Sequence, residues 1–328
     1  MHLKVLITGV EAFVASHLVD YILENVPDAE IFGTSRRLAD RANIAHVLDK
    51  IKILDMELAD YHSVFNVVDS VKPDKVFHLA AQSFVPASWT SPAATIETNT
   101  VGTVHLLEAV RKCCPSAYVH VQGSSEEYGM VLMGETPITE GNPLRPLSPY
   151  GVSKVGADLA GYQYAHSYHM NITRVRSFNM TGARRGEVFA TSNFAKQIAE
   201  VELLIREPKL LHGNLEAIRD FTDVRDSVRA YWMLSEKEAH GDVYNVCSGK
   251  GWTMKEVIGI LIECSGSNAI ALIADPERMR PSDVPILIGC PYKVNEFTGW
   301  SVRYDFKETM AYLYDYWLKK LDLTYGKK

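Results

Sequence analysis

Short apolar runs alternate with longer segments of helical spacing along the first half of the chain. The run at residues 4–9 is β-branched and ends in glycine, which predicts a buried parallel strand. Apolar side chains recur at helical spacing over residues 12–23. We predict further strands at 30–34, 51–54, 75–81, 117–122, 173–177 and 244–247, and helices at 98–111, from 149 and from about 191. This alternation predicts an α/β fold: a Rossmann-type, doubly wound, mostly parallel sheet.

The length of 328 residues allows one large domain or two unequal lobes. We expect a nucleotide-binding domain over residues 1–178, completed by later segments near 218–250. A smaller C-terminal lobe over residues 179–328, interleaved with that domain, would cover the carboxyl edge of the sheet and bind substrate.

Composition narrows the classes of partner. The net charge of -6 argues against nucleic acid, because phosphate binding favours a basic face. Five cysteines, an odd number without a C-x-x-C pair, indicate neither a disulfide framework nor a zinc site, and we expect no metal. We see no charged leader and no apolar run near the roughly 18 residues of a membrane-spanning helix. We therefore expect a cytoplasmic protein with reduced thiols.

The first turn only partly fits a dinucleotide site. Such a turn expects glycine at three positions, and here they are Gly9, Ala12 and Ala15. Alanine at 15 adds one methyl group, whereas alanine at 12 stands where the backbone approaches a pyrophosphate. One glycine of three is weak support, and a plain βα turn is the alternative. If this turn binds a dinucleotide, Phe13 and Val14 lie at the start of the helix that follows it.

The strand ends supply further cofactor candidates. Arg36 and Arg37 follow the second predicted strand, where an acidic side chain would hold a ribose 2′-hydroxyl and arginines would accommodate a 2′-phosphate. We therefore favour NADP(H) over NAD(H), with solvated surface arginines as the alternative. Asp55 and Met56 follow the third strand, where Asp55 could reach the adenine. The fourth strand ends in small side chains that leave room for a flat cofactor, and the candidates there are Leu79, Ala80, Ala81 and Ser83. His78 in the fourth strand is predicted to be a core histidine.

An acid/base pair is predicted in P-Y-G-V-S-K. Tyr150 and Lys154 stand four residues apart, on one face of a helix. A nearby ammonium favours the phenolate and would lower the tyrosine pKa from about 10 toward neutrality. An ordinary helix start with a solvated lysine is the alternative. Ser124, Ser125 and Glu126 follow the fifth predicted strand, at the edge where open α/β sheets bind ligands.

In this order and spacing, A-A-Q-S, S-S-E-E-Y-G and Y-G-V-S-K resemble the extended short-chain dehydrogenase/reductase family over roughly the whole chain. The resemblance implies NAD(P) on the N-terminal lobe and a nucleotide sugar on the C-terminal lobe. It also implies that Ser124 binds the substrate oxygen, Tyr150 trades its proton, and Lys154 tunes the tyrosine and holds the nicotinamide ribose. A homodimer or homotetramer is implied as well.

The second half is similar to the branch that handles GDP-mannose and its derivatives, through R-R-G-E at 184–187, G-N-L-E-A-I-R-D-F-T-D-V-R-D at 213–226 and R-P-S-D-V at 280–284. Arg219 and Arg280 would clamp the diphosphate, since arginine makes charge-assisted bidentate bonds to phosphate. Asp283 would accept from a ribose hydroxyl. The other substrate candidates are Ser83, Ser125, Asn179, Lys196 and Asn214.

Two activities of that branch compete. The reductase delivers hydride to C4 of the 4-keto-6-deoxy sugar and gives GDP-D-rhamnose. The 4,6-dehydratase oxidises C4, eliminates water across C5 and C6 with a glutamate as base, and returns the hydride to C6. The S-S-E-E-Y-G segment favours the reductase, whereas R-R-G-E favours the dehydratase and Glu126 fits its base. A non-catalytic relative that binds a GDP-sugar is the third possibility, which intact Ser124, Tyr150 and Lys154 disfavour.

Overall fold

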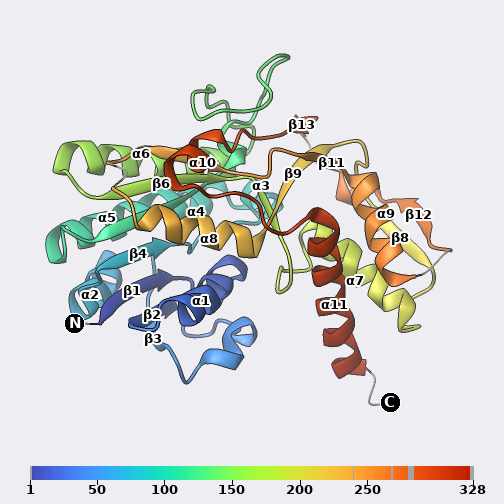
Figure 1. Ribbon diagram of the computed structural model, residues 1–328, viewed down its shortest axis with the longest axis horizontal. Helices are drawn as coiled ribbons and strands as arrows, with labels where there is room; N and C mark the ends of the chain where they lie inside the picture. Colours follow the sequence, from blue (N-terminus) through green and yellow to red (C-terminus); the bar gives the residue numbers. More distant parts are fainter. Residues whose placement is uncertain (1, 239, 267–268, 280–283, 326–328) are drawn as a thin grey trace.

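The computed structural model describes residues 2–238, 240–266, 269–279 and 284–325. Its larger unit is a seven-stranded sheet in the order β10-β6-β5-β4-β1-β2-β3, with every neighbouring pair parallel (Figure 1). The strands are β1 (Leu3–Thr8), β2 (Ala29–Ser35), β3 (Lys52–Asp55), β4 (Lys75–His78), β5 (Tyr118–Ser124), β6 (Ile172–Ser177) and β10 (Val243–Val246). The predicted Rossmann-type sheet is confirmed.

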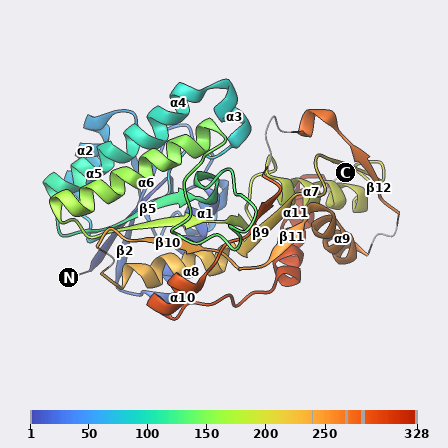
Figure 2. The ribbon, with the colours of Figure 1, turned by 90° about the horizontal axis from the view of Figure 1, so that it is seen from above.

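Helices cover both faces of this sheet (Figure 2). One face carries α1 (Phe13–Asn25), α8 (Val224–Ser235) and α10 (Tyr292–Thr298), and the other carries α2 (Tyr61–Val71), α5 (Gly102–Cys113) and α6 (Pro149–Tyr168). Short segments join them: η1 (Ala42–Val47), α3 (Val85–Thr90), α4 (Pro92–Ile96), the π-helical η2 (Glu97–Val101) and η3 (Ser125–Glu127). Two separate apolar cores result, as expected when helices bury their apolar faces on both sides of a parallel sheet.

The smaller lobe has its own core, on the right in Figure 1. Its strands are β7 (Asn179–Thr181), β9 (Ile218–Asp223), β11 (Gly251–Thr253) and β13 (Ile286–Leu287), with a second sheet of β8 (Lys209–His212) and β12 (Ala271–Ala274). Its helices are α7 (Ala190–Glu202), α9 (Met254–Ser265) and α11 (Phe306–Tyr325), and η4 (Pro276–Arg278) follows β12. The chain leaves the large sheet after β6 and returns to it at β10, so the two units interleave. The exact division at residues 178 and 179 stays a prediction.

Local sequence explains where α6 begins. The Ser148 hydroxyl accepts a hydrogen bond from the N–H of Gly151 at 3.0 Å, and Pro149 occupies the first helical position. A serine cap followed by proline is a strong start signal, because the serine accepts from a free N–H of the first turn and proline has no N–H that needs a partner. The helix ends at His169, which adopts a left-handed conformation.

The strand order reverses between β1 and β4, which places a crevice at their carboxyl ends. Gly9, directly after β1, has a φ of 66°, and a Cβ there would lie 3.0 Å from the Cα of Ala80. Glycine therefore allows the turn after β1 to contact the segment after β4. The paired residues Thr8 and His78, and Ser124 and Ser177, end their strands at this same edge.

Candidate functional site

Tyr150, Lys154 and Ser124 come together, as the sequence predicted. Tyr150 and Lys154 lie one turn apart on α6, and their side chains are buried. The Lys154 Nζ donates to the carbonyl of Gln122 in β5 at 2.8 Å and lies 5.9 Å from the centre of the Tyr150 ring. The hydroxyl of Ser124, at the end of β5, hydrogen-bonds the Tyr150 side chain. The three groups form one buried donor set.

A glycine allows α6 to lie this close to the turn after β5. A Cβ on Gly151 would lie 2.7 Å from the carbonyl oxygen of Glu126. Any larger residue would therefore push α6 away from η3. The glycine next to Tyr150 keeps the tyrosine beside Ser124 and Glu126.

Burial decides the charge state of the pair. It raises the pKa of Tyr150 well above the usual value, while the Ser124 hydrogen bond and the nearby Arg185 act in the opposite direction. Burial also lowers the pKa of Lys154 to about 8, against the negative charge of Glu127. We expected Lys154 to bring the tyrosine pKa toward neutrality, but desolvation has the largest effect here and raises that pKa. Tyr150 keeps its proton and is poised as a donor.

Arg185 is a site residue that sequence reasoning missed. Its guanidinium lies over the rings of Phe189 and Phe13, at 4.0 and 5.1 Å from their centres, and it acts on Tyr150 electrostatically. Burial lowers the pKa of Arg185 to about 10, which leaves it charged, and no carboxylate among the described residues pairs with it. A desolvated cation beside the first turn suits an anionic ligand. The R-R-G-E segment is the sequence signal that could have found this residue.

The neighbouring arginine holds this segment in place. Arg184, in the left-handed region at a φ of 68°, forms an ion pair with Asp20 and donates to His17 Nδ1 at 3.2 Å. Because a guanidinium only donates, His17 must carry its proton on Nε2 and donate to the carbonyl of Ala183 at 2.9 Å. Burial lowers the pKa of His17 to about 4, with Arg184 adding to the effect, so the neutral ring that this arrangement needs is present at neutral pH.

The first turn fits a dinucleotide despite its alanines. Ala12 is extended, at φ −69° and ψ 160°, a conformation that needs no glycine, and its N–H donates to the carbonyl of Gly9. Among the described residues no side chain caps α1, and its first turn, which starts at Phe13 and Val14, carries no acidic residue. Its free N–H groups are thus available to a phosphate. Ala12 adds only its methyl to that space.

The adenosine-side candidates lie at the ends of β2 and β3. Arg36 and Arg37 are exposed, as a role in binding a 2′-phosphate would allow. Asp55 ends β3 and lies 4.0 Å from Arg41, whereas Met56 is buried in the core. None of these placements distinguishes cofactor contact from an ordinary surface, so the assignments stay predictions.

Hydrogen bonds fix the segment after β4. The Thr8 hydroxyl accepts from the N–H groups of Leu79 and Ala80, at 3.1 and 3.0 Å, and contacts His78 Nδ1 at 2.9 Å. The other ring nitrogen of His78 contacts Thr103, whose hydroxyl donates to Asn99 at 2.6 Å. His78 is therefore a core histidine, as predicted, and it holds this segment, which continues through Ala81 to Ser83.

Asn99 is a second residue that sequence reasoning missed. It lies in the π-helical segment η2, a rare helix type that often marks functional sites. Its side chain accepts from the N–H of Gln82 at 2.8 Å and donates to the Gln82 carbonyl and to the Ser153 hydroxyl, both at 2.9 Å. Asn99 therefore connects the segment after β4 with the catalytic helix. Only its hydrogen-bond partners, Gln82 and Ser153, reveal this role of Asn99, and both are distant from it in the sequence.

The structure describes most of the predicted substrate-binding residues, and they lie in different elements. Arg219 in β9 is buried, and its Nη1 donates to the carbonyl of Ile218 at 2.9 Å. Asn179 begins β7 and pairs with β9, and Asn214 accepts from the N–H of Glu216 at 3.0 Å just before β9. Ser125 is buried directly after Ser124. Arg280 and Asp283 lie outside the described residues.

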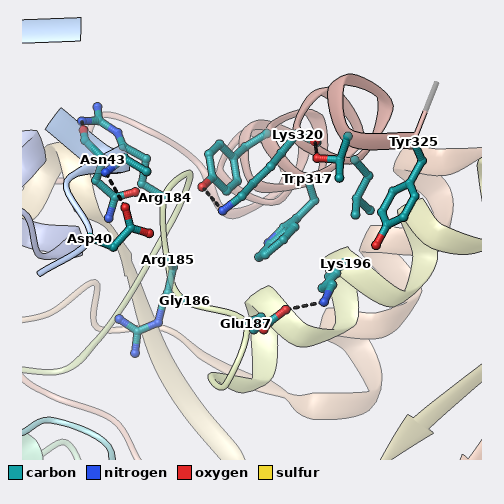
Figure 3. A pocket seen from close by; sticks show the side chains of 14 residues that line it. Asp40, Asn43, Arg184, Arg185, Gly186, Glu187, Lys196, Trp317, Lys320 and Tyr325 are labelled. Carbon is teal, nitrogen blue, oxygen red and sulfur yellow. Dashed lines mark hydrogen bonds and ion pairs between the residues drawn. The ribbon is translucent and has the colours of Figure 1, made fainter. Parts of the chain in front are cut away.

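Lys196 lines a different cavity, of about 420 Å³, between η1, the 184–187 segment, α7 and α11 (Figure 3). It forms ion pairs with Glu187 and Glu200 and lies over the ring of Trp317. Arg185 lines this cavity too, although its guanidinium points away from Trp317 in Figure 3. The role of Lys196 in substrate binding stays a prediction.

Within the described part of the chain, no group of three or more His, Cys, Asp or Glu side chains is arranged to hold a metal ion. No helix there has the length and apolar character needed to cross a membrane.

Comparison with known proteins gives the family. The family profile described as GDP-mannose 4,6 dehydratase matches residues 6–313. The chain belongs to this family. The predicted GDP-sugar branch of the extended short-chain dehydrogenase/reductases is thereby confirmed, and with it the expectation of an enzyme of this type.

Two curated relatives represent both candidate activities. The GDP-mannose 4,6-dehydratase of Yersinia enterocolitica is 30% identical over 94% of this chain and 92% of its own length. The GDP-6-deoxy-D-mannose reductase of Pseudomonas aeruginosa is 31% identical over 75% of this chain and 80% of its own.

Solved structures agree on the fold. RMD from Pseudomonas aeruginosa, complexed with NADPH, has a TM-score of 0.84 at 26% identity, with 97% and 99% of the two chains covered. The UDP-glucose 4-epimerase of Thermus thermophilus, in complex with NAD, has a TM-score of 0.84 at 27% identity, covering 96% and 99%. The neighbours thus hold nicotinamide cofactors of both kinds.

We predict that Ala12→Gly tightens NADP(H) binding or leaves it unchanged, because removal of the methyl only widens the space above the turn. Ala15→Gly is the control: it lies within α1 and should cost stability of about 1 kcal/mol without this gain. Fluorescence titration with NADPH checks the affinity and urea unfolding checks the stability. An affinity loss beyond about threefold in Ala12→Gly would mean that the methyl itself contacts the ligand.

Proposed function

We propose that this protein reduces the C4 keto group of GDP-4-keto-6-deoxy-D-mannose to give GDP-D-rhamnose, with NADPH as cofactor. The observation that carries this proposal is the buried Tyr150 hydroxyl, which lies beside Ser124 and one helical turn from Lys154. Reduction of a ketone needs a proton donor at the carbonyl oxygen, and a tyrosine that holds its proton is suited to that task.

Each residue of the set then has a task. Ser124 donates a hydrogen bond to the C4 oxygen and orients it toward Tyr150. Tyr150 gives its proton to that oxygen as negative charge develops there. Lys154, fixed by the Gln122 carbonyl, stabilises the phenolate that remains. NADPH, when bound, supplies the hydride; the first turn, the segment after β4 and Arg185 would hold it.

The nucleotide sugar would lie between the two units. Arg219 and Asn179, on paired strands of the smaller lobe, are the described candidates for its phosphates. The names of the curated relatives support a GDP-sugar, and arginine suits a diphosphate.

The GDP-mannose 4,6-dehydratase reaction is the second candidate. Glu126 stands two residues after Ser124, where that reaction needs a base for the C5 proton. The match of the family profile and of the Yersinia relative also supports it.

Two parallel incubations decide between them. One holds GDP-mannose with NADP, and the other holds GDP-4-keto-6-deoxy-D-mannose with NADPH. Loss of NADPH absorbance in the second alone establishes the reductase. Conversion of GDP-mannose without net cofactor change establishes the dehydratase and gives Glu126 its role. If neither reaction occurs and cofactor does not bind, the protein is a non-catalytic relative.

We predict that Tyr150→Phe lowers kcat by at least about a hundredfold, because only the proton donor is lost. NADPH affinity should stay within about threefold of the unmodified protein, since the ring remains. Tyr164→Phe, on the same helix but bonded to Glu108, is the control and should turn over normally. Steady-state kinetics with NADPH titration checks both. Unchanged turnover in Tyr150→Phe would remove the tyrosine from the mechanism.

We also predict that Arg36→Ala combined with Arg37→Ala weakens NADPH binding at least about tenfold and NADH binding far less, because only NADPH carries a 2′-phosphate. Lys112→Ala, an exposed cation at the end of α5, is the control for loss of surface charge. Isothermal titration with both cofactors measures the difference. Equal losses for the two cofactors would contradict the NADP assignment.

We further propose that the protein works in the cytoplasm as a homodimer. Exposed apolar side chains on the adjacent α4, η2 and α6 support a pairing face: Ile96, Val101, Val152, Leu159 and Tyr162. Val152 and Leu159 stand seven residues apart, so they share one face of α6.

A charge on this face should separate the subunits, because an unpaired carboxylate is costly to bury. We predict that Leu159→Glu halves the mass measured by light scattering. Leu323→Glu, the same change at a more exposed position on α11, should leave the mass unchanged. If both variants keep the mass of the unmodified protein, the interface lies elsewhere or the protein is a monomer.

A further inference from the structure

A fully buried glutamate lies directly beneath the catalytic set, and the mechanism above gives it no task. Glu127 is 0% exposed. Its Oε1 accepts from the N–H of Ser124 at 2.7 Å, and its Oε2 accepts from Arg176 Nε at 3.1 Å. The first contact closes a capping box, because Ser124 in turn caps the η3 segment. Glu127 therefore holds the backbone of the residue whose hydroxyl faces Tyr150.

Every element around Glu127 presents a charged or titratable group to it. From β6 come Arg174 and Arg176, and from α6 comes Asp158, which pairs with both arginines. The carboxyl of Asp158 also contacts that of Glu127. The two cations and two anions balance when both carboxyls are ionised.

The remaining groups around Glu127 belong to the catalytic helix and to η3. Tyr150 and Lys154 lie above it on α6, Glu126 precedes it, and Tyr128 follows it with its ring against Arg176. The charge of Glu127 disfavours the phenolate of Tyr150 and favours the ammonium of Lys154.

The connection from Glu127 to Lys154 is short. Lys154 and Asp158 stand four residues apart on α6, on one face of the helix. Arg176 Nε reaches both Asp158, at 2.8 Å, and Glu127. Lys154 itself donates to Gln122, two residues before Ser124 in β5. Glu127 is the group whose charge favours the ammonium of this desolvated lysine.

We propose that Glu127 is a positioning residue of this site: it orients Ser124 through the backbone N–H, and its negative charge favours the ammonium of Lys154, so that Lys154 loses its proton at a higher pH than it otherwise would. The inference rests on the proposed function, since it concerns the same catalytic set. Burial, with Asp158 adding to it, raises the pKa of Glu127 to about 8, so its charge appears over the range in which Lys154 would lose its proton. The two groups therefore change charge over the same range of pH.

The direct test follows Lys154 in the protein without cofactor. Lysine labelled with ¹³C at the ε-carbon gives its titration by NMR, and Lys154→Arg identifies the signal. Glu127→Gln keeps the size of the side chain and removes its charge, so the Lys154 midpoint should move to lower pH. Glu135→Gln is the matched control, because it removes a surface glutamate–arginine pair from the loop after η3. It should leave the midpoint unchanged.

Kinetics provides a second measurement. Glu127→Gln should turn over within about threefold of the unmodified protein near pH 6.5, where Glu127 is already neutral, and about tenfold slower near pH 9. A purely structural role would lower the rate equally at both values. A Lys154 midpoint that does not move in folded Glu127→Gln overturns the inference.

The unmodified protein gives an independent test if the variant does not fold. The ¹⁵N shift of the Ser124 amide, which donates to Glu127, should titrate together with Lys154 in the alkaline range. A Ser124 shift that stays constant there overturns the inference. A moved Lys154 midpoint without turnover on either sugar supports the role of Glu127 and removes the proposed reaction, so the two hypotheses fail separately.

Discussion

Two buried arginines in β6 hold the sheet and the catalytic helix together. Every residue of β6 is buried, so Arg174 and Arg176 must find their counter-charges inside the protein. Asp158 on α6 pairs with both arginines, and the carboxyl of Glu127 after β5 accepts a hydrogen bond from Arg176. Removal of one partner from such a cluster costs about 3–5 kcal/mol, because the remaining charge stays buried without compensation. This constraint fixes α6, and with it Tyr150 and Lys154, relative to the end of β5.

On the other side of the crevice, a chain of hydrogen bonds between uncharged groups also fixes α6 relative to the sheet. The hydroxyl of Thr103 donates to Asn99, so His78 must donate to Thr103 through Nε2 and accept from Thr8 through Nδ1. Burial lowers the pKa of His78 to about 3, which keeps the ring neutral as this arrangement requires. Asn99 extends the chain to Ser153, between the two catalytic residues of α6. The expected cofactor contacts and the proton donor are thus parts of one network.

The same physics explains why one site could serve either of two reactions. The donor set of Ser124, Tyr150 and Lys154 is needed in both, and burial makes it a proton donor first. What distinguishes reduction from dehydration is a second base, and Glu126 lies within the η3 turn, next to Glu127. The choice therefore depends on how the sugar is held by the smaller lobe, through residues such as Arg219.

The sequence by itself determined the order of strands and helices, because apolar runs and helical spacing are local, and it determined the chemistry of Ser124, Tyr150 and Lys154 through their motifs. It also marked His78 as a core residue. The tertiary structure alone decided which groups meet: it gave Asn99, Arg185 and Glu127 their places, and it paired Lys196 with Glu187 and Glu200. It also reversed the expected pKa direction of Tyr150. The physical reason is that desolvation and charge pairing depend on residues far apart in the chain, which no local pattern records.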